Sequence, residues 1–255
     1  MGKILLVIAA LLLPNLAWSA GGGHTFPNDD IDIDWDDKAS MQRGARTFVN
    51  YCMGCHSAAF SRYNRVGEDL GIADELVIEN LIFTTDDKGE RTKVGELMTI
   101  AMTPEYGETS FGIVPPDLSL IARSRGVDWL YNYLRGYYID ESREGLGVNN
   151  GVFANVGMPH VLAELQGLQI PKYGTQSDGH GGEQEIIVGF DIIKPGSMSK
   201  SEYDQTIYDL VAFLDYVAEP YKQTRKNVGT GVLIFLFGFL ILAYLLKKEY
   251  WKDVH

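Results

Sequence analysis

The chain has 255 residues, of which 45% are hydrophobic and 22% are charged, and its formal net charge is −12 at neutral pH. This composition excludes a disordered chain and predicts either one folded domain or a domain with large insertions. The negative charge would repel nucleic acid and anionic lipid headgroups, and it would attract a basic protein partner. In the alternative, an acidic surface only keeps the domain soluble. We therefore expect protein partners and no nucleic-acid partner.

The N-terminus has the layout of a secretory signal peptide. A lysine precedes an apolar run at residues 4–13, and small residues follow this run. We expect cleavage after Ser19 or Ala20, which makes residues 1–19 the signal peptide. The alternative is an uncleaved membrane anchor, although the apolar run is short for a membrane span.

The acidic segment NDDIDIDWDD, at residues 28–37, follows the predicted cleavage site. Its charge predicts a solvated N-terminal arm. In the alternative, the apolar residues that alternate with the acidic ones dock the arm against another surface. These apolar residues are Ile31, Ile33 and Trp35.

The C-terminal region contains VGTGVLIFLFGFLILAYLL, a stretch of uncharged residues at positions 228–246. At about 1.5 Å per residue, a helix of this length crosses the hydrocarbon core of a bilayer. The nearest basic residues are equally numerous on both sides of the stretch, so they do not orient it. The predicted signal peptide does: it places the domain at residues 20–227 outside the cytoplasm and the tail at residues 247–255 inside.

The two cysteines of the chain, Cys52 and Cys55, are separated by two residues and followed directly by His56. Such a pair can form a redox disulfide, contribute to a zinc site or anchor a haem. Thiol oxidoreductases place this motif at the start of a helix, whereas residues 40–51 predict a helix that begins at the N-cap Ser40 and ends at the motif. A zinc site needs four ligands, and no second cysteine pair is present.

The motif C-x-x-C-H predicts one covalent haem c. The two sulfurs form thioether bonds to the haem, and His56 binds the iron as an axial ligand. Export of the domain favours this interpretation, because such haems are attached outside the cytoplasm. Both thiols are then used, so we expect no structural disulfide.

The second axial position can be empty, or a methionine or a histidine can fill it. The candidates that follow the haem motif in the chain are Met98, Met102, Met158, Met198, His160 and His180. Met98 and Met102 are four residues apart, which predicts packing on one buried helix face. Met198 precedes the start of a predicted helix.

Met158 is the candidate that we assign to the iron. It lies on the glycine-rich segment NNGVFANVGMPHVL, which predicts a loop, and Pro159 stiffens the backbone beside it. His160, two residues further on, is the main alternative. A closed pair of histidine and methionine suits electron transfer, whereas an open axial position binds small ligands.

A helix near the end of the exported domain is predicted to begin at SEYD, residues 201–204, which has the pattern of a capping box. It carries one apolar stripe, made of Ile207, Leu210, Val211, Leu214 and Ala218. We expect this stripe to pack on the helix at residues 41–51, where Gly44 allows close approach and Phe48 fills the crossing.

These features together resemble the cytochrome c1 family. The resemblance rests on the signal peptide, YCMGCHS, VPPDLSLIARSRG, GMPHV, VAEP and the single C-terminal span, and it covers nearly the whole mature chain. Its most specific part is PPDLSLIARSRG, between the haem motif and the methionine loop. It implies a mainly α protein with the class I c-type cytochrome fold, inserted loops and one C-terminal transmembrane helix. Residues 67–112 and 170–195 match no pattern and are interpreted as variable insertions.

The resemblance implies a role for each matching residue. The axial ligands would be His56 and Met158, and thioether bonds would join Cys52 and Cys55 to the haem. A disulfide that some relatives contain cannot form here, because no other cysteine is present.

Two further roles follow from the resemblance. The backbone carbonyl of Pro115 or Pro116 would accept a hydrogen bond from the far ring nitrogen of His56 and fix the orientation of the ring. Arg125 would pair with a haem propionate, with Arg123 as its neighbour. The alternative for both arginines is an ordinary exposed side chain.

The function implied by the resemblance is single-electron transfer in the cytochrome bc1 complex, the ubiquinol:cytochrome c reductase. The chain would accept an electron from the Rieske iron-sulfur protein and pass it to a cytochrome c, with its C-terminal helix in the membrane lipid beside cytochrome b. It would belong to a dimeric complex in the inner membrane of a bacterium, with the haem domain in the periplasm. The chain itself is then an electron carrier, and the assembled complex is the enzyme.

Two alternatives stay open on the sequence. One is a membrane-tethered haem sensor or ligand-binding domain with an open axial position. The other is a c-type subunit of a different respiratory complex.

Overall fold

The computed structural model describes residues 29–86, 88–177 and 182–253, so the predicted signal peptide lies outside the described residues. As predicted, the described part is mainly α. Its α-helices are α2 (Lys38–Thr47), α3 (Tyr63–Leu70), α4 (Asp74–Asn80), α5 (Pro104–Phe111), α6 (Ile121–Arg125), α7 (Val127–Arg135), α8 (Ala163–Gln166), α9 (Lys200–Ala218) and α10 (Lys222–Tyr250). A π-helical turn, η1 (Phe48–Cys52), continues α2 up to the first cysteine.

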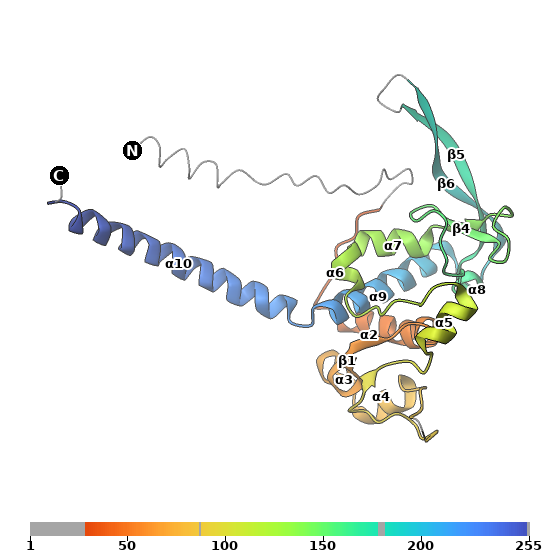
Figure 1. Cartoon of the computed structure of the whole chain (residues 1–255), viewed down its shortest axis with the longest axis horizontal. Coiled ribbons are helices and arrows are strands. Elements are labelled where there is room, and N and C mark those ends of the chain that lie inside the picture. The colour runs from red at the N-terminus through yellow and green to blue at the C-terminus, as the bar shows by residue number, and fades with distance from the viewer. Residues whose placement is uncertain (1–28, 87, 178–181, 254–255) are drawn as a thin grey trace.

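α2 and α9 cross and pack against each other, as the sequence predicted, and their crossing lies within the hydrophobic core (Figure 1). Gly44 lies so close to α9 that a Cβ atom there would be 2.0 Å from the backbone oxygen of Asp209. The rings of Phe48 and Phe213 meet beside this contact, with their centroids 5.6 Å apart. All residues of the predicted apolar stripe are buried. The crossing therefore joins the segment that leads into the haem motif to the last helix of the domain.

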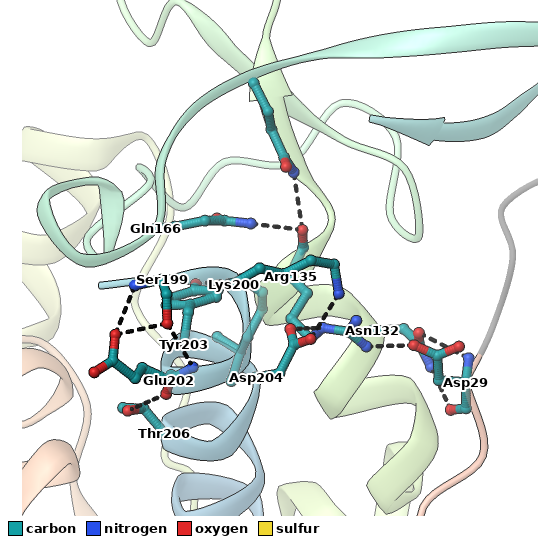
Figure 2. A network of polar contacts seen from close by, with 12 residues as sticks. Asp29, Asn132, Arg135, Gln166, Ser199, Lys200, Glu202, Tyr203, Asp204 and Thr206 are labelled. Carbon is teal, nitrogen blue, oxygen red and sulfur yellow. Dashed lines mark hydrogen bonds and ion pairs between the residues drawn. The ribbon is translucent and has the colours of Figure 1, made fainter. Parts of the chain in front are cut away.

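Both helices begin at positions other than those predicted. The N-cap of α2 is Asp37, whose carboxylate accepts a hydrogen bond from the backbone N–H of Ser40, so Ser40 lies inside the helix. The capping box of α9 is formed by Ser199 and Glu202, upstream of the predicted SEYD box (Figure 2). In each case two suitable caps lie within three residues of each other, and the sequence pattern does not choose between them.

The acidic N-terminal arm is docked on the domain, so the prediction of a solvated arm is wrong. Ile33 is buried against the core. The backbone N–H of Ile31 donates to the carboxylate of Asp128 on α7 at 2.8 Å, and the indole N–H of Trp35 donates to Asp215 on α9 at 3.1 Å. The alternation of apolar and acidic residues therefore separates a docked face of the arm from an exposed one.

The described residues also form two-stranded antiparallel sheets. They pair β1 (Ala58–Arg62) with β2 (Leu97–Met98), β3 (Tyr137–Ile139) with β4 (Val148–Asn150), and β5 (Gly167–Ser177) with β6 (Glu183–Pro195). Met98 lies in β2 and Met102 precedes α5, so the predicted helix face shared by these two residues is wrong. The long hairpin β5–β6 projects from the domain in Figure 1 and contains most of the segment at 170–195.

The last helix, α10, contains the predicted span at residues 228–246. It has 29 residues, and none of its most apolar window is buried in the protein. In Figure 1 it runs away from the body of the domain. Within the described part of the chain, α10 is the helix that is long and apolar enough to cross a membrane.

Candidate functional site

The two cysteines lie where the first core helix ends. Cys52 is the last residue of η1 and is buried, whereas Cys55 is partly exposed, and both are free thiols. The chain then turns tightly, because the backbone N–H groups of Cys55 and His56 both donate to the carbonyl oxygen of Cys52, at 3.0 and 2.9 Å. One short segment therefore presents two thiols and an imidazole.

The thiols do not have the properties of a redox disulfide or a zinc site. Burial raises the pKa of the Cys52 thiol to about 12, with a smaller contribution from Cys55, whereas redox-active cysteine pairs have a lowered pKa. Among the residues that the structure describes, no three side chains of His, Cys, Asp and Glu are grouped to hold a metal ion. Neither alternative is therefore supported by the geometry.

His56 is held by the segment that contains the two prolines. Its Nδ1 atom lies 2.7 Å from the carbonyl oxygen of Pro116, and its side chain is buried. Because a carbonyl only accepts hydrogen bonds, Nδ1 is the protonated nitrogen. Burial lowers the pKa of His56, although the Pro116 carbonyl and the Asp117 carboxylate oppose this shift. The neutral ring keeps a lone pair on Nε2, which is free to bind a metal ion.

A cavity of about 290 Å³ lies beside Cys55. Pro115, Val114 and Met102 are among the residues that line it. The two prolines therefore differ in position: Pro115 lies near the second cysteine, and Pro116 contacts the histidine. Met102 is also near the motif, and it is the natural control for any test of the assigned methionine.

Met158 lies on an irregular loop, as the glycine-rich sequence predicted, and two tyrosines contact it there. The hydroxyl of Tyr133, on α7, lies 3.6 Å from the sulfur of Met158, and the hydroxyl of Tyr137 lies 3.4 Å from its carbonyl oxygen. Burial raises the pKa of both tyrosines, so both hydroxyls are protonated. A Cβ atom on Gly157 would be 3.8 Å from Ile113. The methionine loop therefore lies next to the segment that leads into the two prolines.

The other candidate ligands are placed differently. Met98 is fully buried in the core, and the sulfur of Met198 accepts a hydrogen bond from Thr206 at 3.5 Å. His180 lies outside the described residues.

His160 packs against one of these tyrosines, Tyr137. Its ring stacks on Tyr137, with the centroids 4.7 Å apart and the planes 5° from parallel. Its Nε2 atom is buried and has no hydrogen-bond partner among the described residues. Burial lowers the pKa of His160 to about 4, although the nearby Gln166 side chain partly opposes this shift. His160 is therefore a neutral ring in the wall behind the methionine loop.

Arg125 ends α6 and covers two aromatic rings. Its guanidinium carbon is 5.1 Å from the ring centroid of Trp129 and 5.9 Å from that of Phe153. Trp129 in turn stacks on Tyr133, with the centroids 4.7 Å apart. A row of aromatic rings therefore connects Arg125 to the loop of Met158. No carboxylate in the described ranges forms an ion pair with Arg125, so its charge is available to an acidic group of a ligand.

Exposed apolar side chains lie beside these residues. Ile113, beside Gly157, is 58% exposed, Val114, in the wall of the cavity at Cys55, is 42% exposed, and Phe153, under Arg125, is 44% exposed. Clustered apolar side chains at a surface indicate a binding site. Two thiols, a neutral imidazole, a thioether, an unpaired guanidinium and an apolar surface together are the groups that a c-type haem requires. The residues present therefore fit a haem c.

Residues 29–254 match the family model described as the Cytochrome C1 family. This protein belongs to the cytochrome c1 family. Cytochrome c1 of Allochromatium vinosum is 45% identical over 255 residues, which is the whole of both chains. The ammonia monooxygenase gamma subunit of Nitrosomonas europaea is 46% identical over 250 residues, which covers 98% of this chain and 97% of that protein. Cytochrome c1 of Rhodospirillum rubrum is 26% identical over 273 residues, which covers 98% of each chain.

The sequence pattern of this cytochrome c1 family member did not identify Tyr133 and Tyr137 as contacts of Met158. The available signal was the spacing of Trp129, Tyr133 and Tyr137, which are four residues apart and predict one helix face. That pattern indicates packing, and it does not reveal that the face meets a methionine on a distant loop.

Proposed function

We propose that this cytochrome c1 family member binds one haem c and carries single electrons from a Rieske iron-sulfur protein to a cytochrome c. The observation that carries the proposal is the hydrogen bond between His56 Nδ1 and the Pro116 carbonyl, directly after two free thiols. It leaves a neutral, oriented imidazole at the one place in the chain where a haem can be attached covalently. When bound, the haem supplies the one-electron couple.

The residues of the chain would hold this haem from several sides. Cys52 and Cys55 would form the thioether bonds, and His56 would offer Nε2 to the iron. Met158 would offer its sulfur from its irregular loop, and Arg125 would pair with a propionate. The Pro116 carbonyl would fix the imidazole, since such partners of metal-bound histidines set ring orientation and ligand strength.

A closed axial position distinguishes electron transfer from ligand sensing. The tyrosine contacts restrain Met158 in its loop, which supports a permanent ligand rather than an exchangeable one. We therefore expect a six-coordinate haem that does not bind carbon monoxide in the reduced protein, in contrast to a haem sensor with an open position.

We further propose that α10 anchors the chain in the inner membrane of a bacterium. In this topology residues 1–19 are removed, residues 20–227 form the periplasmic domain, residues 228–246 span the bilayer and residues 247–255 are cytoplasmic. The full exposure of the apolar part of α10 supports the anchor, because a soluble protein would bury such a helix.

The complex that we propose is the cytochrome bc1 complex, a dimer in which α10 lies beside cytochrome b. The names of the cytochrome c1 relatives support this assignment. The net charge of −12 supports a basic cytochrome c as the acceptor, because opposite charge speeds association. The relative named ammonia monooxygenase gamma subunit favours a second candidate, in which the chain serves a monooxygenase assembly.

Two leucine variants test the axial assignment. Met158→Leu removes the sulfur from the proposed ligand loop, and Met102→Leu removes the sulfur beside Cys55. In the holoprotein we expect Met158→Leu to lose the long-wavelength absorption band of methionine-bound ferric haem and to bind carbon monoxide when reduced. Met102→Leu should behave as the wild type. The assignment fails if Met158→Leu leaves the spectrum unchanged.

Copurification tests the complex. The full chain, tagged at its C-terminus, would be extracted from membranes of its own host in mild detergent. Recovery of a b-type cytochrome and a Rieske protein with quinol:cytochrome c reductase activity supports the cytochrome bc1 complex. Recovery of monooxygenase subunits instead supports the second candidate.

A further inference from the structure

We infer that Tyr133 is a positioning residue that tunes the haem through the sulfur of Met158, and that Tyr137 acts on the haem through Tyr133. This inference rests on the proposed role of Met158 as an iron ligand. It extends that proposal, because it assigns a cause to the strength of the ligand.

The three polar contacts in this cluster define the direction of each hydrogen bond. The Tyr133 hydroxyl lies 3.6 Å from the Met158 sulfur, and the two tyrosine oxygens lie 2.8 Å apart. A thioether sulfur only accepts, so Tyr133 donates its single proton to Met158. Tyr137 must then be the donor in the short contact with Tyr133. The 3.4 Å contact of Tyr137 with the carbonyl oxygen of Met158 is longer and competes only weakly for that proton.

Packing fixes the donor in place. Tyr133 lies on α7, and its ring is stacked on Trp129 at 4.7 Å and packed edge-on to Tyr137 at 5.5 Å. Tyr137 is 1% exposed, and its ring also stacks on His160. The Tyr133 hydroxyl therefore reaches the sulfur from a rigid helix with few alternative rotamers.

Donation to a ligand sulfur has a predictable effect on a haem. The hydrogen bond withdraws electron density from the sulfur and makes it a weaker donor to iron. Weaker donation from the sulfur destabilises oxidised iron more than reduced iron, so it raises the reduction potential. Hydrogen bonds to metal ligands are a general means of tuning metal sites. A chain of two hydroxyls polarises the last bond, so that Tyr137 strengthens the effect of Tyr133.

The test uses the full-length holoprotein in detergent, with potentials measured by redox titration. The variants are Tyr133→Phe, Tyr137→Phe and the double variant, with Tyr131→Phe as the matched control. Tyr131 lies on the same helix and is 9% exposed, and its ring packs under Arg135 at 4.3 Å. For Tyr133→Phe we expect about a fivefold shift toward the oxidised form at a fixed potential, which is about 40 mV lower at about 59 mV per tenfold.

The expected pattern is not additive. Tyr137→Phe should lower the potential by less than Tyr133→Phe, the double variant should equal Tyr133→Phe, and Tyr131→Phe should match the wild type. Haem content and thermal unfolding verify that each variant is folded. Equal potentials for Tyr133→Phe and the wild type would overturn the inference, and an additive double variant would overturn the role of Tyr137.

The outcomes also separate this inference from the proposed function. If Met158→Leu loses the methionine band while Tyr133→Phe keeps the wild-type potential, the ligand assignment stands and the tuning role is wrong. If Met158→Leu keeps the band, the ligand assignment fails and the tuning role fails with it.

Discussion

The carboxylate of Asp209 is buried at the crossing of α2 and α9, and the guanidinium of Arg43 covers it from the solvent side. Two nearly parallel hydrogen bonds join them, at 2.6 Å from Nε and 2.9 Å from the terminal nitrogen. The side chain of Asp209 is 4% exposed, whereas that of Arg43 is 46% exposed. Ser40 donates a further hydrogen bond to the same carboxylate at 2.6 Å. Removal of Arg43 would therefore leave an unpaired charge in the interior, whereas removal of Asp209 would leave one that reaches solvent.

Replacing the exposed Arg43 should lower the free energy of unfolding more than replacing the buried Asp209. Arg43→Met leaves a buried carboxylate without a cation, and we expect it to lower the free energy of unfolding by about 3 kcal/mol. Asp209→Asn leaves a guanidinium that can turn into water, so its expected cost is about 1 kcal/mol. Chemical denaturation of the holoprotein measures both values. A larger loss for Asp209→Asn would contradict this account of the pair.

Gly44 is the second feature on which this crossing depends. A methyl group there would lie 2.0 Å from the backbone oxygen of Asp209 and 2.8 Å from Cβ of Phe213, so Gly44→Ala forces the two helices apart. We expect a loss of about 3 kcal/mol in the free energy of unfolding. The control is Gly95→Ala, because a Cβ atom at Gly95 meets nothing within 4 Å. If both variants unfold at the same denaturant concentration, the close approach does not limit stability.

The features that could be predicted from the sequence depend on short-range patterns. The haem motif is five residues long. The apolar residues of the helix predicted at residues 41–51 and of the stripe on α9 recur with the helical period. The glycine of the crossing could also be predicted, because a helix interior carries glycine at some cost unless close packing requires it.

The features that could not be predicted depend on a distant partner. Trp35 docks the acidic arm because Asp215 lies beside it, although the two residues are 180 positions apart. The role of Tyr133 depends on the fold of an irregular loop around Met158. Charge and periodicity carry no information about these pairings, so the sequence predicted a solvated arm.

The capping box of α9 predicts a pH dependence. The Ser199 hydroxyl and its backbone N–H both donate to the Glu202 carboxylate and lower the pKa of Glu202 below 4.5 (Figure 2). Because the pKa is lower in the folded protein, this contribution to stability is complete at a pH well above the ordinary glutamate pKa and is lost as the pH falls through the folded value. We expect Glu202→Gln to be less stable than the wild type at pH 7. The two should converge at low pH in thermal unfolding, and parallel curves would rule out the charge as the cause.

Lys222, the first residue of α10, forms a junction between the membrane helix and the domain. Its ammonium lies 2.7 Å from the Asp215 carboxylate and 5.0 Å from the ring centroid of Trp35. The Asp215 side chain is 6% exposed, and the indole of Trp35 is its other donor. The N-terminal arm, α9 and α10 are therefore held at one buried carboxylate.

Removal of this cation should loosen the arm as well as the junction. Lys222→Met leaves the Asp215 carboxylate with the indole alone, and we expect a loss of about 2 kcal/mol in the free energy of unfolding. Trp35→Phe removes one hydrogen bond but keeps a ring in place, so its cost should be about 1 kcal/mol. Limited proteolysis of the arm should quicken in both variants. The control is Lys226→Met, one turn further along α10 and exposed, which should match the wild type. Equal proteolysis of Lys222→Met and Lys226→Met would mean that the arm is held independently of α10.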